Sequence, residues 1–461
     1  MKKSIIFSII FIFIFLSAFS LPVSADYYNM NLEDMRSDAY LLVNVDTGTT
    51  VFSQNADKQL KCASLVKTAT AIVVVENCEN LDAVVTVSES ALEPLKGLYS
   101  ASSDLQAGEQ ISVRNLMYCM MLQNSNDAAN VLAEYVGGSI ENFVKMMNDL
   151  AKKLGCKNTN FTNAHGLDED GEYSSANDMY ILTKYAMNIS VLADMADTEE
   201  YTVPATNMSE PRELTTRLDI IEKGSRYYYD YAKGFKVGHT DGSKRCASVV
   251  ATKDAYTYIA IVLGCPNECI DNCGYPDNTA LYEARRMLRW AVRELRMTTI
   301  AGTSDILTDI PVKLSSQADH VRLVPEKQVQ ALLLSSVDES SLEYIFDLAE
   351  GVNAPVNKGD VLGSVKIKYA DNVIAEVNLV AGDSLSRNAL MYAGHIFKTV
   401  VLSPVFIIVV SVALLVMIVY MMIVYKKYKK KQKQAKDRIR EIKKKNYTED
   451  SNIFDFEDIK K

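Results

Sequence analysis

The stretch that decides the fold is "CASLVKTATA", residues 62–71, which places Ser64 and Lys67 three positions apart before an apolar run. Side chains at i and i+3 share a helix face, so the nitrogen of Lys67 can reach the oxygen of Ser64. The N-terminus of a helix also favours negative charge that develops beside Ser64. The same spacing is compatible with an ordinary amphipathic helix, so the rest of the chain must decide between the two interpretations.

A second cation later in the chain strengthens the catalytic interpretation. A lysine acts as a base only if its ammonium can lose a proton, and burial or a nearby cation lowers its pKa. Lys236 in "GFKVGHTDG" is a suitable cation on a predicted strand. Gly238 lies two residues further on and lets a ligand backbone approach that strand closely.

The order of periodic segments predicts a mixed fold. A hairpin with strands 39–45 and 49–55 is followed by helical segments, then by strands and one further amphipathic helix. The helices are predicted at 63–77, 113–123, 127–138, 140–155 and 175–188, the strands at 232–240, 245–254 and 256–265, and the last helix at 279–295. This order predicts an α/β (α+β) domain, residues 26–298, whose antiparallel sheet joins both ends of the segment.

The chain beyond Thr298 has a different pattern. Six short alternating runs separated by turn residues predict a small all-β domain, residues 305–381. A linker, residues 382–399, connects this domain to an apolar segment without charge, residues 400–425, which is long enough to cross a bilayer. We therefore expect one C-terminal transmembrane helix.

Both ends of the chain indicate export and membrane anchoring. Residues 1–25 have a basic start, an apolar stretch and small residues at the end, which predicts a cleaved signal peptide; the alternative is an uncleaved anchor. The basic tail, residues 426–461, marks the cytoplasmic side of the membrane helix. The preceding domains are therefore expected outside the cytoplasm of a single-pass membrane protein.

The charge distribution excludes nucleic acid as a partner of the main domain. The formal net charge is −9 overall; the tail carries +7 and residues 1–25 carry +2, which leaves −18 for residues 26–425. An acidic domain does not attract a phosphate backbone.

The eight cysteines permit disulfides in an exported protein. Cys265, Cys269 and Cys273 lie in one turn-rich stretch without a nearby histidine, so a local disulfide is favoured over zinc. We expect neither a metal nor a cofactor.

The ordered motifs resemble a known group of proteins. Ser-x-x-Lys, an Asn-containing loop between helices and Lys-x-Gly on a strand form the pattern of penicillin-binding proteins and serine β-lactamases. The segments "LQNSNDAANVLAEYVGGS" and "NFTNAHGLDEDGEYSSANDM" further resemble the D-alanyl-D-alanine carboxypeptidases of the low-molecular-mass penicillin-binding proteins, serine peptidase family S11. The resemblance spans residues 38–381 and implies a β-lactamase/penicillin-binding-protein-like transpeptidase domain, with a helical cluster, before that family's C-terminal β domain.

The resemblance implies a role for each motif residue. Ser64 would be the acylated nucleophile, Lys67 its base, and Asn126 would hold the substrate's amide and orient Lys67. Lys236 would bind the terminal carboxylate of the peptide beside Gly238. The backbone N–H groups of Ser64 and His239 would form the oxyanion hole.

Two positions depart from the family pattern. Asn124 stands where the family has the serine of Ser-x-Asn, and an amide cannot relay a proton to a leaving amine. Ser125 is one position away from that place in the pattern. Val237 stands where the family usually has threonine, and it lacks the hydroxyl that would bind the substrate carboxylate. His239 shares a strand face with Val237 and is expected to replace that hydroxyl in part.

The resemblance implies a D-alanyl-D-alanine carboxypeptidase of a bacterium, expected to be Gram-positive, with peptidoglycan stem peptides as substrate and β-lactams as acylating inhibitors. Asn124 and Val237 predict a slower or altered enzyme. The alternative is a non-catalytic peptidoglycan-binding scaffold, and a β-lactamase is disfavoured because no deacylating glutamate is identified. Family topology also brings Cys62 near Cys246, as a disulfide or as two buried thiols. His165 and Trp290 are expected to be structural.

Overall fold

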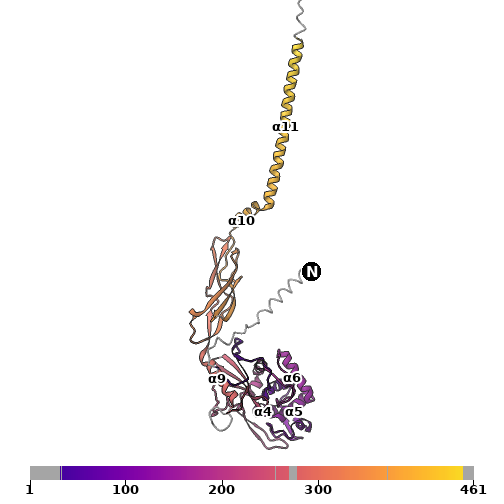
Figure 1. Ribbon diagram of the computed structural model, residues 1–461, viewed down its shortest axis with the longest axis vertical. Coiled ribbons are helices and arrows are strands. Elements are labelled where there is room, and N and C mark those ends of the chain that lie inside the picture. Colours follow the sequence, from indigo (N-terminus) through magenta and orange to yellow (C-terminus); the bar gives the residue numbers. More distant parts are fainter. Residues whose placement is uncertain (1–31, 33, 255, 269–277, 371, 450–461) are drawn as a thin grey trace, which may run out of the picture. The chain divides into compact units, whose positions relative to one another are not determined.

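The computed structural model describes residues 32–449, apart from residues 33, 255, 269–277 and 371 (Figure 1). The predicted signal peptide lies outside the described residues, as do Cys269 and Cys273 of the proposed local disulfide. Contacts divide the chain into two compact units, and the first contains every element from β1 to α9.

An antiparallel sheet of five strands organises this α/β fold. Its order is β2-β1-β9-β8-β7, so the N-terminal hairpin lies beside strands that come some 200 residues later in the chain. Strand β7 is an edge strand. The strands are β1 (Ala39–Asn44), β2 (Thr49–Gln54), β7 (Ala232–Thr240), β8 (Lys244–Lys253) and β9 (Tyr256–Cys265). The structure confirms the prediction that the sheet joins both ends of the segment.

Alternation along the strands gives the sheet two buried faces. Leu41 and Val43 of β1 join the core formed with the helical cluster, whereas Leu42 points to the opposite face. Helix α9 (Thr279–Glu294) packs on β8 and β9. Its Trp290 ring lies 4.9 Å from the ring of Phe52, which agrees with a structural role for Trp290.

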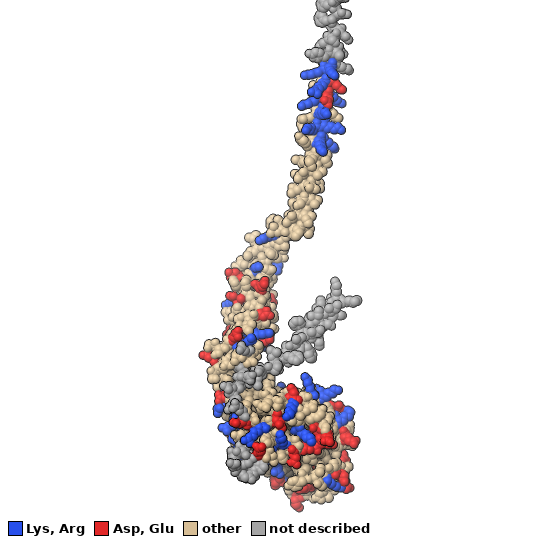
Figure 2. Space-filling view, in the orientation of Figure 1, with Lys and Arg blue, Asp and Glu red and all other residues tan. Residues whose placement is uncertain are grey.

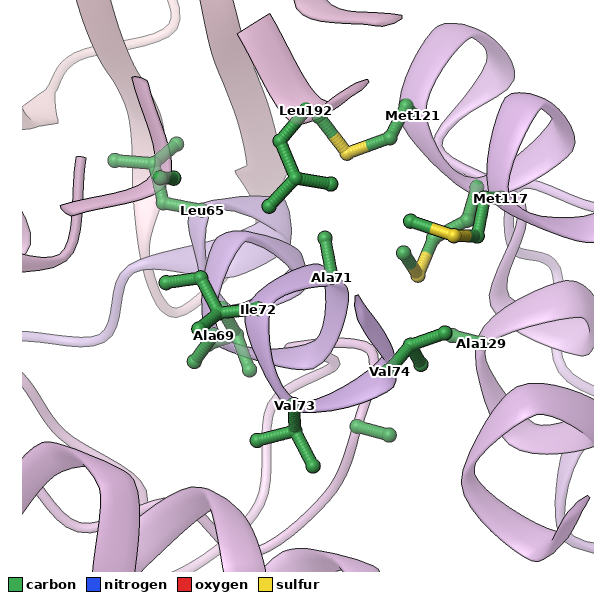
Figure 3. Close-up of a cluster of buried hydrophobic side chains, with 14 of the residues drawn as sticks. Leu65, Ala69, Ala71, Ile72, Val73, Val74, Met117, Met121, Ala129 and Leu192 are labelled. Atoms are coloured by element: carbon green, nitrogen blue, oxygen red, sulfur yellow. The ribbon is translucent and has the colours of Figure 1, made fainter. Parts of the chain in front are cut away.

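Helix α2 (Lys67–Asn77) is the centre of the helical cluster, and every residue from Lys67 to Val74 is buried. Figure 3 shows its apolar side chains together with Met117 and Met121 of α4 and Ala129 of α5. The other helices are η2 (Ala63–Val66), α3 (Glu89–Leu92), η3 (Glu93–Leu95), α4 (Val113–Gln123), α5 (Asn126–Gly137), α6 (Ile140–Leu154), α7 (Ala176–Met187) and α8 (Ser190–Ala196).

Serine side chains cap five of these helices, and Ser88 caps α3 by accepting from the N–H of Ala91. Ser112, Ser125, Ser139 and Ser175 cap α4, α5, α6 and α7 by accepting a hydrogen bond from a backbone N–H in the first turn. These caps explain why the predicted helix limits agree with the observed ones to within one residue. The sequence did not predict α8 or the short strand pairs β3 (Val84–Thr86) with β4 (Gln110–Ser112) and β5 (Glu200–Val203) with β6 (Arg212–Thr215).

The strands after α9 form two further sheets. Strand β10 (Leu295–Ala301) pairs with β13 (Val329–Leu334), although the sequence analysis assigned no strand to β10. A six-stranded sheet has the order β14-β16-β17-β12-β11-β15. Its strands are β11 (Thr308–Lys313), β12 (His320–Pro325), β14 (Glu343–Leu348), β15 (Val352–Asn353), β16 (Val361–Tyr369) and β17 (Asn372–Ala381). An all-β domain was predicted for this region.

Two helices follow the last strand. Helix α10 (Ala389–Val401) is followed by its C-cap residue Leu402. Helix α11 begins at Pro404 and continues to Glu449. The predicted membrane helix, residues 400–425, therefore starts four residues later than expected, because proline is favoured in the first turn of a new helix. Helix α11 is long and apolar enough to cross a membrane. Figure 2 shows its uncharged first part and the basic side chains that follow.

Candidate active site

The nucleophile and its lysine lie at the junction of η2 and α2. Ser64 belongs to the 3-10 turn η2, and Lys67 is the first residue of α2. Lys67 Nζ lies 3.1 Å from Ser64 Oγ. Residues i and i+3 are aligned in a 3-10 helix, so this turn brings the pair together more directly than an α-helix would. The predicted contact is confirmed, on a 3-10 turn rather than inside an α-helix.

The Lys67 ammonium is buried and surrounded by acceptors. Besides Ser64 Oγ, its nitrogen donates to Asn126 Oδ1 at 2.6 Å and to the backbone carbonyl of His165 at 2.6 Å. Burial lowers the pKa of Lys67 to about 7, while the carboxylates of Glu172 and Asp127 act in the opposite direction. A lysine with this pKa has an accessible neutral form near neutral pH, as a general base requires.

The turn between α4 and α5 holds the motif that departs from the family pattern. Asn124 ends α4 in the left-handed conformation, with φ of 61°, which asparagine tolerates better than most residues. Ser125 is buried; its hydroxyl caps α5 and contacts the carboxylate of Asp127. Asn124 Nδ2 donates to the carbonyl oxygen of Val237 at 3.2 Å. Asn124 therefore points toward β7, whereas the Ser125 hydroxyl is used within α5.

Lys236 links β7 to the end of α4. Its side chain is buried, and its nitrogen donates to the carbonyls of Met120 and Met121 at 2.8 and 2.5 Å. Burial and the charge of Lys67 both lower the pKa of Lys236. The C-terminal end of α4 carries the negative end of the helix dipole, which favours the ammonium form of Lys236.

Gly238 allows β7 to approach the nucleophile. A Cβ atom at this position would lie 2.5 Å from the backbone nitrogen of Ser64 and 2.8 Å from Cβ of Ala63. Gly238 was expected to make room for a ligand backbone, but in the structure this space is taken by the protein's own η2 turn. The missing side chain therefore sets the distance between strand and nucleophile.

Strand β7 presents backbone groups at its open edge. The carbonyl of Val237 faces away from β8, because it accepts the Asn124 amide. Backbone groups alternate along a strand, so the N–H of His239 points to the same edge. The side chain of Val237 is buried, whereas that of His239 is exposed.

The loop before α7 supplies three further residues near the site: His165, which was expected to be structural, and Asn163 and Glu172, which were not predicted. The carbonyl of His165 holds Lys67, while the His165 ring accepts from the N–H of Leu167. Burial and the Lys67 charge lower the pKa of His165 to about 3, so its ring is neutral. Asn163 accepts from the backbone N–H of His165 and donates to the carboxylate of Glu172. Their signal was hidden in an acidic run that looks like a solvated loop.

Cys62 and Cys246 are free, buried thiols in the structure, which agrees with one of the two alternatives. Burial raises the pKa of both thiols, that of Cys246 to about 12. Among the described residues, no group of three or more histidine, cysteine or acidic side chains is arranged to hold a metal ion.

Comparison with known proteins agrees with this geometry. Residues 26–267 match the profile of peptidase family S11, D-alanyl-D-alanine carboxypeptidase. The chain belongs to this family. Residues 296–387 match the C-terminal domain of penicillin-binding protein 5. This S11 peptidase therefore has the two-domain arrangement of the low-molecular-mass penicillin-binding proteins.

Curated relatives cover most of the S11 chain. D-alanyl-D-alanine carboxypeptidase DacF of Bacillus subtilis is 26% identical over 350 residues, which is 75% of this chain and 85% of the relative. D-alanyl-D-alanine carboxypeptidase DacC of Escherichia coli is 27% identical over 391 residues, 81% of this chain and 90% of the relative.

Solved structures share the fold. Penicillin-binding protein 5 of Haemophilus influenzae aligns with a TM-score of 0.58 at 23% identity, covering 78% of this chain and all of that one. The carboxypeptidase DacD of Francisella tularensis aligns with a TM-score of 0.61 at 21% identity, covering 81% and 98%. At these identities the likeness supports the fold alone.

Proposed function

We propose that this S11 peptidase is a D-alanyl-D-alanine carboxypeptidase that removes the terminal D-alanine from peptidoglycan stem peptides through an acyl-enzyme on Ser64. The observation that carries the proposal is the buried Lys67 nitrogen, 3.1 Å from Ser64 Oγ and with a pKa of about 7. Lys67 takes the hydroxyl proton as Ser64 Oγ attacks the penultimate carbonyl carbon. D-Alanine leaves with a proton, and water then hydrolyses the ester to regenerate Ser64.

The substrate is proposed to lie along the open edge of β7. The N–H groups of Ser64 and His239 would stabilise the oxyanion, and one such donor contributes about 3 kcal/mol to transition-state stabilisation. Asn126 would hold the substrate's amide while it orients Lys67. Lys236 is buried on two carbonyls, so we assign it electrostatic attraction of the terminal carboxylate. β-Lactams would acylate Ser64 in the same place.

Asn124 and Val237 favour a second candidate, a weakly catalytic or non-catalytic scaffold that binds peptidoglycan and penicillin. Asn124 carries no hydroxyl, and its amide is engaged with Val237, so it cannot pass a proton to the departing amine. A β-lactamase is less well supported, because residues 26–267 match a family of D-alanyl-D-alanine carboxypeptidases.

We further propose a single-pass topology in which the apolar part of α11 spans the membrane of a Gram-positive cell and its basic part lies in the cytoplasm. The helix has no charged residue before Lys426 and a dense basic block after it, which is the pattern of a cytoplasmic flank. The catalytic domain would then face the wall, where its substrate is.

Labelling of the detergent-solubilised full-length protein with a fluorescent penicillin tests the proposal. We expect a covalent band for the wild type and none for Ser64→Ala. D-Alanine release from a D-Ala-D-Ala pentapeptide then separates the candidates: label with release supports the carboxypeptidase, and label without release supports the scaffold. A wild-type protein that takes no label would overturn the acyl-enzyme.

A further inference from the structure

Glu172 is a buried acidic residue beside the site that the mechanism above does not use. Its side chain is 5% exposed, and Oε2 accepts from Asn163 Nδ2 at 2.8 Å and from Thr162 Oγ1 at 3.3 Å. Removing a carboxylate from water costs free energy unless it is paired or hydrogen-bonded.

The contacts lead through Asn163 to Lys67. With its amide nitrogen on Glu172, Asn163 turns its carbonyl oxygen toward the backbone N–H groups of His165 and Gly166, at 3.1 and 2.6 Å. The carbonyl of His165 in this turn accepts from Lys67 Nζ at 2.6 Å. Glu172 accepts the shortest of the bonds from Asn163 Nδ2, which also donates to the carbonyl of Leu167 and to Glu169 at 3.1 Å. Glu172 thereby helps to fix which way the Asn163 amide faces, and Asn163 fixes the turn that holds Lys67.

The same turn is pressed against the nucleophile's own element. A Cβ atom on Gly166 would lie 2.0 Å from the carbonyl oxygen of Ala63, the residue before Ser64. A displaced turn would therefore move both the acceptor of Lys67 and the η2 backbone. Small displacements of this kind are costly for a reaction that depends on alignment.

Glu172 also acts on Lys67 through its charge. Its carboxylate raises the pKa of Lys67 against the larger opposing effect of burial. Burial raises the pKa of Glu172 itself to about 7, so the two groups titrate in the same pH range and are coupled. The other ionisable groups that interact with this pair are Cys62, Asp127, His165, Asp168, Glu169 and Lys236.

We propose that Glu172 is a positioning residue. Through Asn163 it orients the His165 carbonyl that accepts from Lys67, and its charge sets the pH range of acylation. The inference rests on the proposed function, because it refines how Lys67 acts as base. Glu172 touches neither the nucleophile nor Lys67 by any described hydrogen bond, so its role is exerted through other groups.

Two substitutions separate position from charge. Glu172→Gln keeps an oxygen that can accept from Asn163 but removes the charge, so the acidic midpoint of the penicillin-labelling rate should fall by about half a pH unit or more, with the plateau rate within about threefold of wild type. Glu172→Ala removes both, and its labelling rate should fall about tenfold or more at every pH. Unfolding temperatures are measured in parallel to confirm that both variants are folded.

Glu169→Gln is the matched control. Glu169 also accepts from Asn163 Nδ2, at 3.1 Å, but its side chain is exposed and its charge affects the pKa of Glu172 less than burial does, so the substitution should shift the profile less than Glu172→Gln does. A Glu172→Gln profile that superposes on wild type would overturn the charge role. A folded Glu172→Ala protein with the wild-type rate would overturn the positioning role.

A readout without activity keeps this inference separate from the proposed function. The folded-state pKa of Glu172 is raised above that of the unfolded chain, so its contribution to stability is full below about pH 4.5 and is lost as the pH rises toward 7. The free energy of unfolding of Glu172→Gln should therefore depend less on pH between 5 and 7. An unchanged slope would overturn the buried charge even if the wild type took no label.

Discussion

The two sides of the site differ in how completely their polar groups are paired. On the nucleophile side, Lys67 has three acceptors, which include Ser64 Oγ and Asn126 Oδ1. On the strand side, Asn124 uses its amide nitrogen on Val237, while Asn124 Oδ1 is buried without a hydrogen-bond partner in the described part of the chain. Under the proposed function, the nucleophile and its base are in contact, and the two changes fall on the groups that would protonate the departing amine and bind the terminal carboxylate.

Gly238→Ala should have the largest effect, because the added Cβ forces β7 and the nucleophile apart. The added Cβ would lie 2.5 Å from the backbone nitrogen of Ser64, so the strand or η2 must shift. We expect the penicillin-labelling rate to fall about a hundredfold or more. Gly394→Ala, where no atom lies within 4 Å of the added Cβ, is the control and should label normally.

The pH profile tests the base on the nucleophile side. The pKa of Lys67 is lowered to about 7, so its neutral, basic form predominates above that pH and is lost below it. The labelling rate should fall by about tenfold for each pH unit below 6, where each unit reduces the neutral fraction tenfold, and less steeply near 7, where Glu172 titrates together with Lys67. Stopped-flow labelling with two different β-lactams checks this, and a rate that stays flat down to pH 5 would exclude Lys67 as the base.

Restoring the family residues tests whether the strand side of the site limits D-alanine release. Asn124→Ser with Val237→Thr supplies a hydroxyl to relay a proton and another to bind the carboxylate. We expect D-alanine release to rise about tenfold, as one regained hydrogen bond to a charged group allows. The penicillin-labelling rate should change less than release does. If release does not rise, the two positions do not limit turnover.

Two capping serines provide the smallest test. Ser139→Ala and Ser125→Ala each remove an N-cap, and each should lower the free energy of unfolding by about 1 kcal/mol. Of these two serines, only Ser125 contacts Asp127, whose carboxylate also accepts from the backbone N–H of Ser103. Ser125→Ala should therefore slow labelling several-fold, whereas Ser139→Ala should not. Urea unfolding and labelling of both variants measure this; equal labelling would remove Ser125 from the site.

The sequence alone predicted the sheet, the helices with strong periodicity and the contact of Ser64 with Lys67. These follow from local spacing and from motif order. The hydrogen bond of Asn124 to Val237 could not be predicted, because it depends on where β7 passes the end of α4. Glu172 was missed because an acidic residue in a turn-rich loop gives the same pattern whether it is solvated or buried.

The boundary errors have equally local causes. Strand β10 continues directly from α9 without a turn residue, so nothing in the sequence separates the two elements. The break between α10 and α11 falls within an apolar run and depends on Pro404. The roles assigned to Lys236 and His239 stay predictions, since they concern a substrate.

The bonds from Lys236 to the last carbonyls of α4 fix the spacing of two walls before any ligand arrives. Asn124 adds a second tie between the same two elements. A peptide that adds to the edge of β7 must therefore fit a space between β7 and the end of α4 whose width these hydrogen bonds have already set. Selection among stem peptides should then depend on the thickness of the acyl group at that edge, and a bulky residue there would be refused at entry rather than during the chemical step.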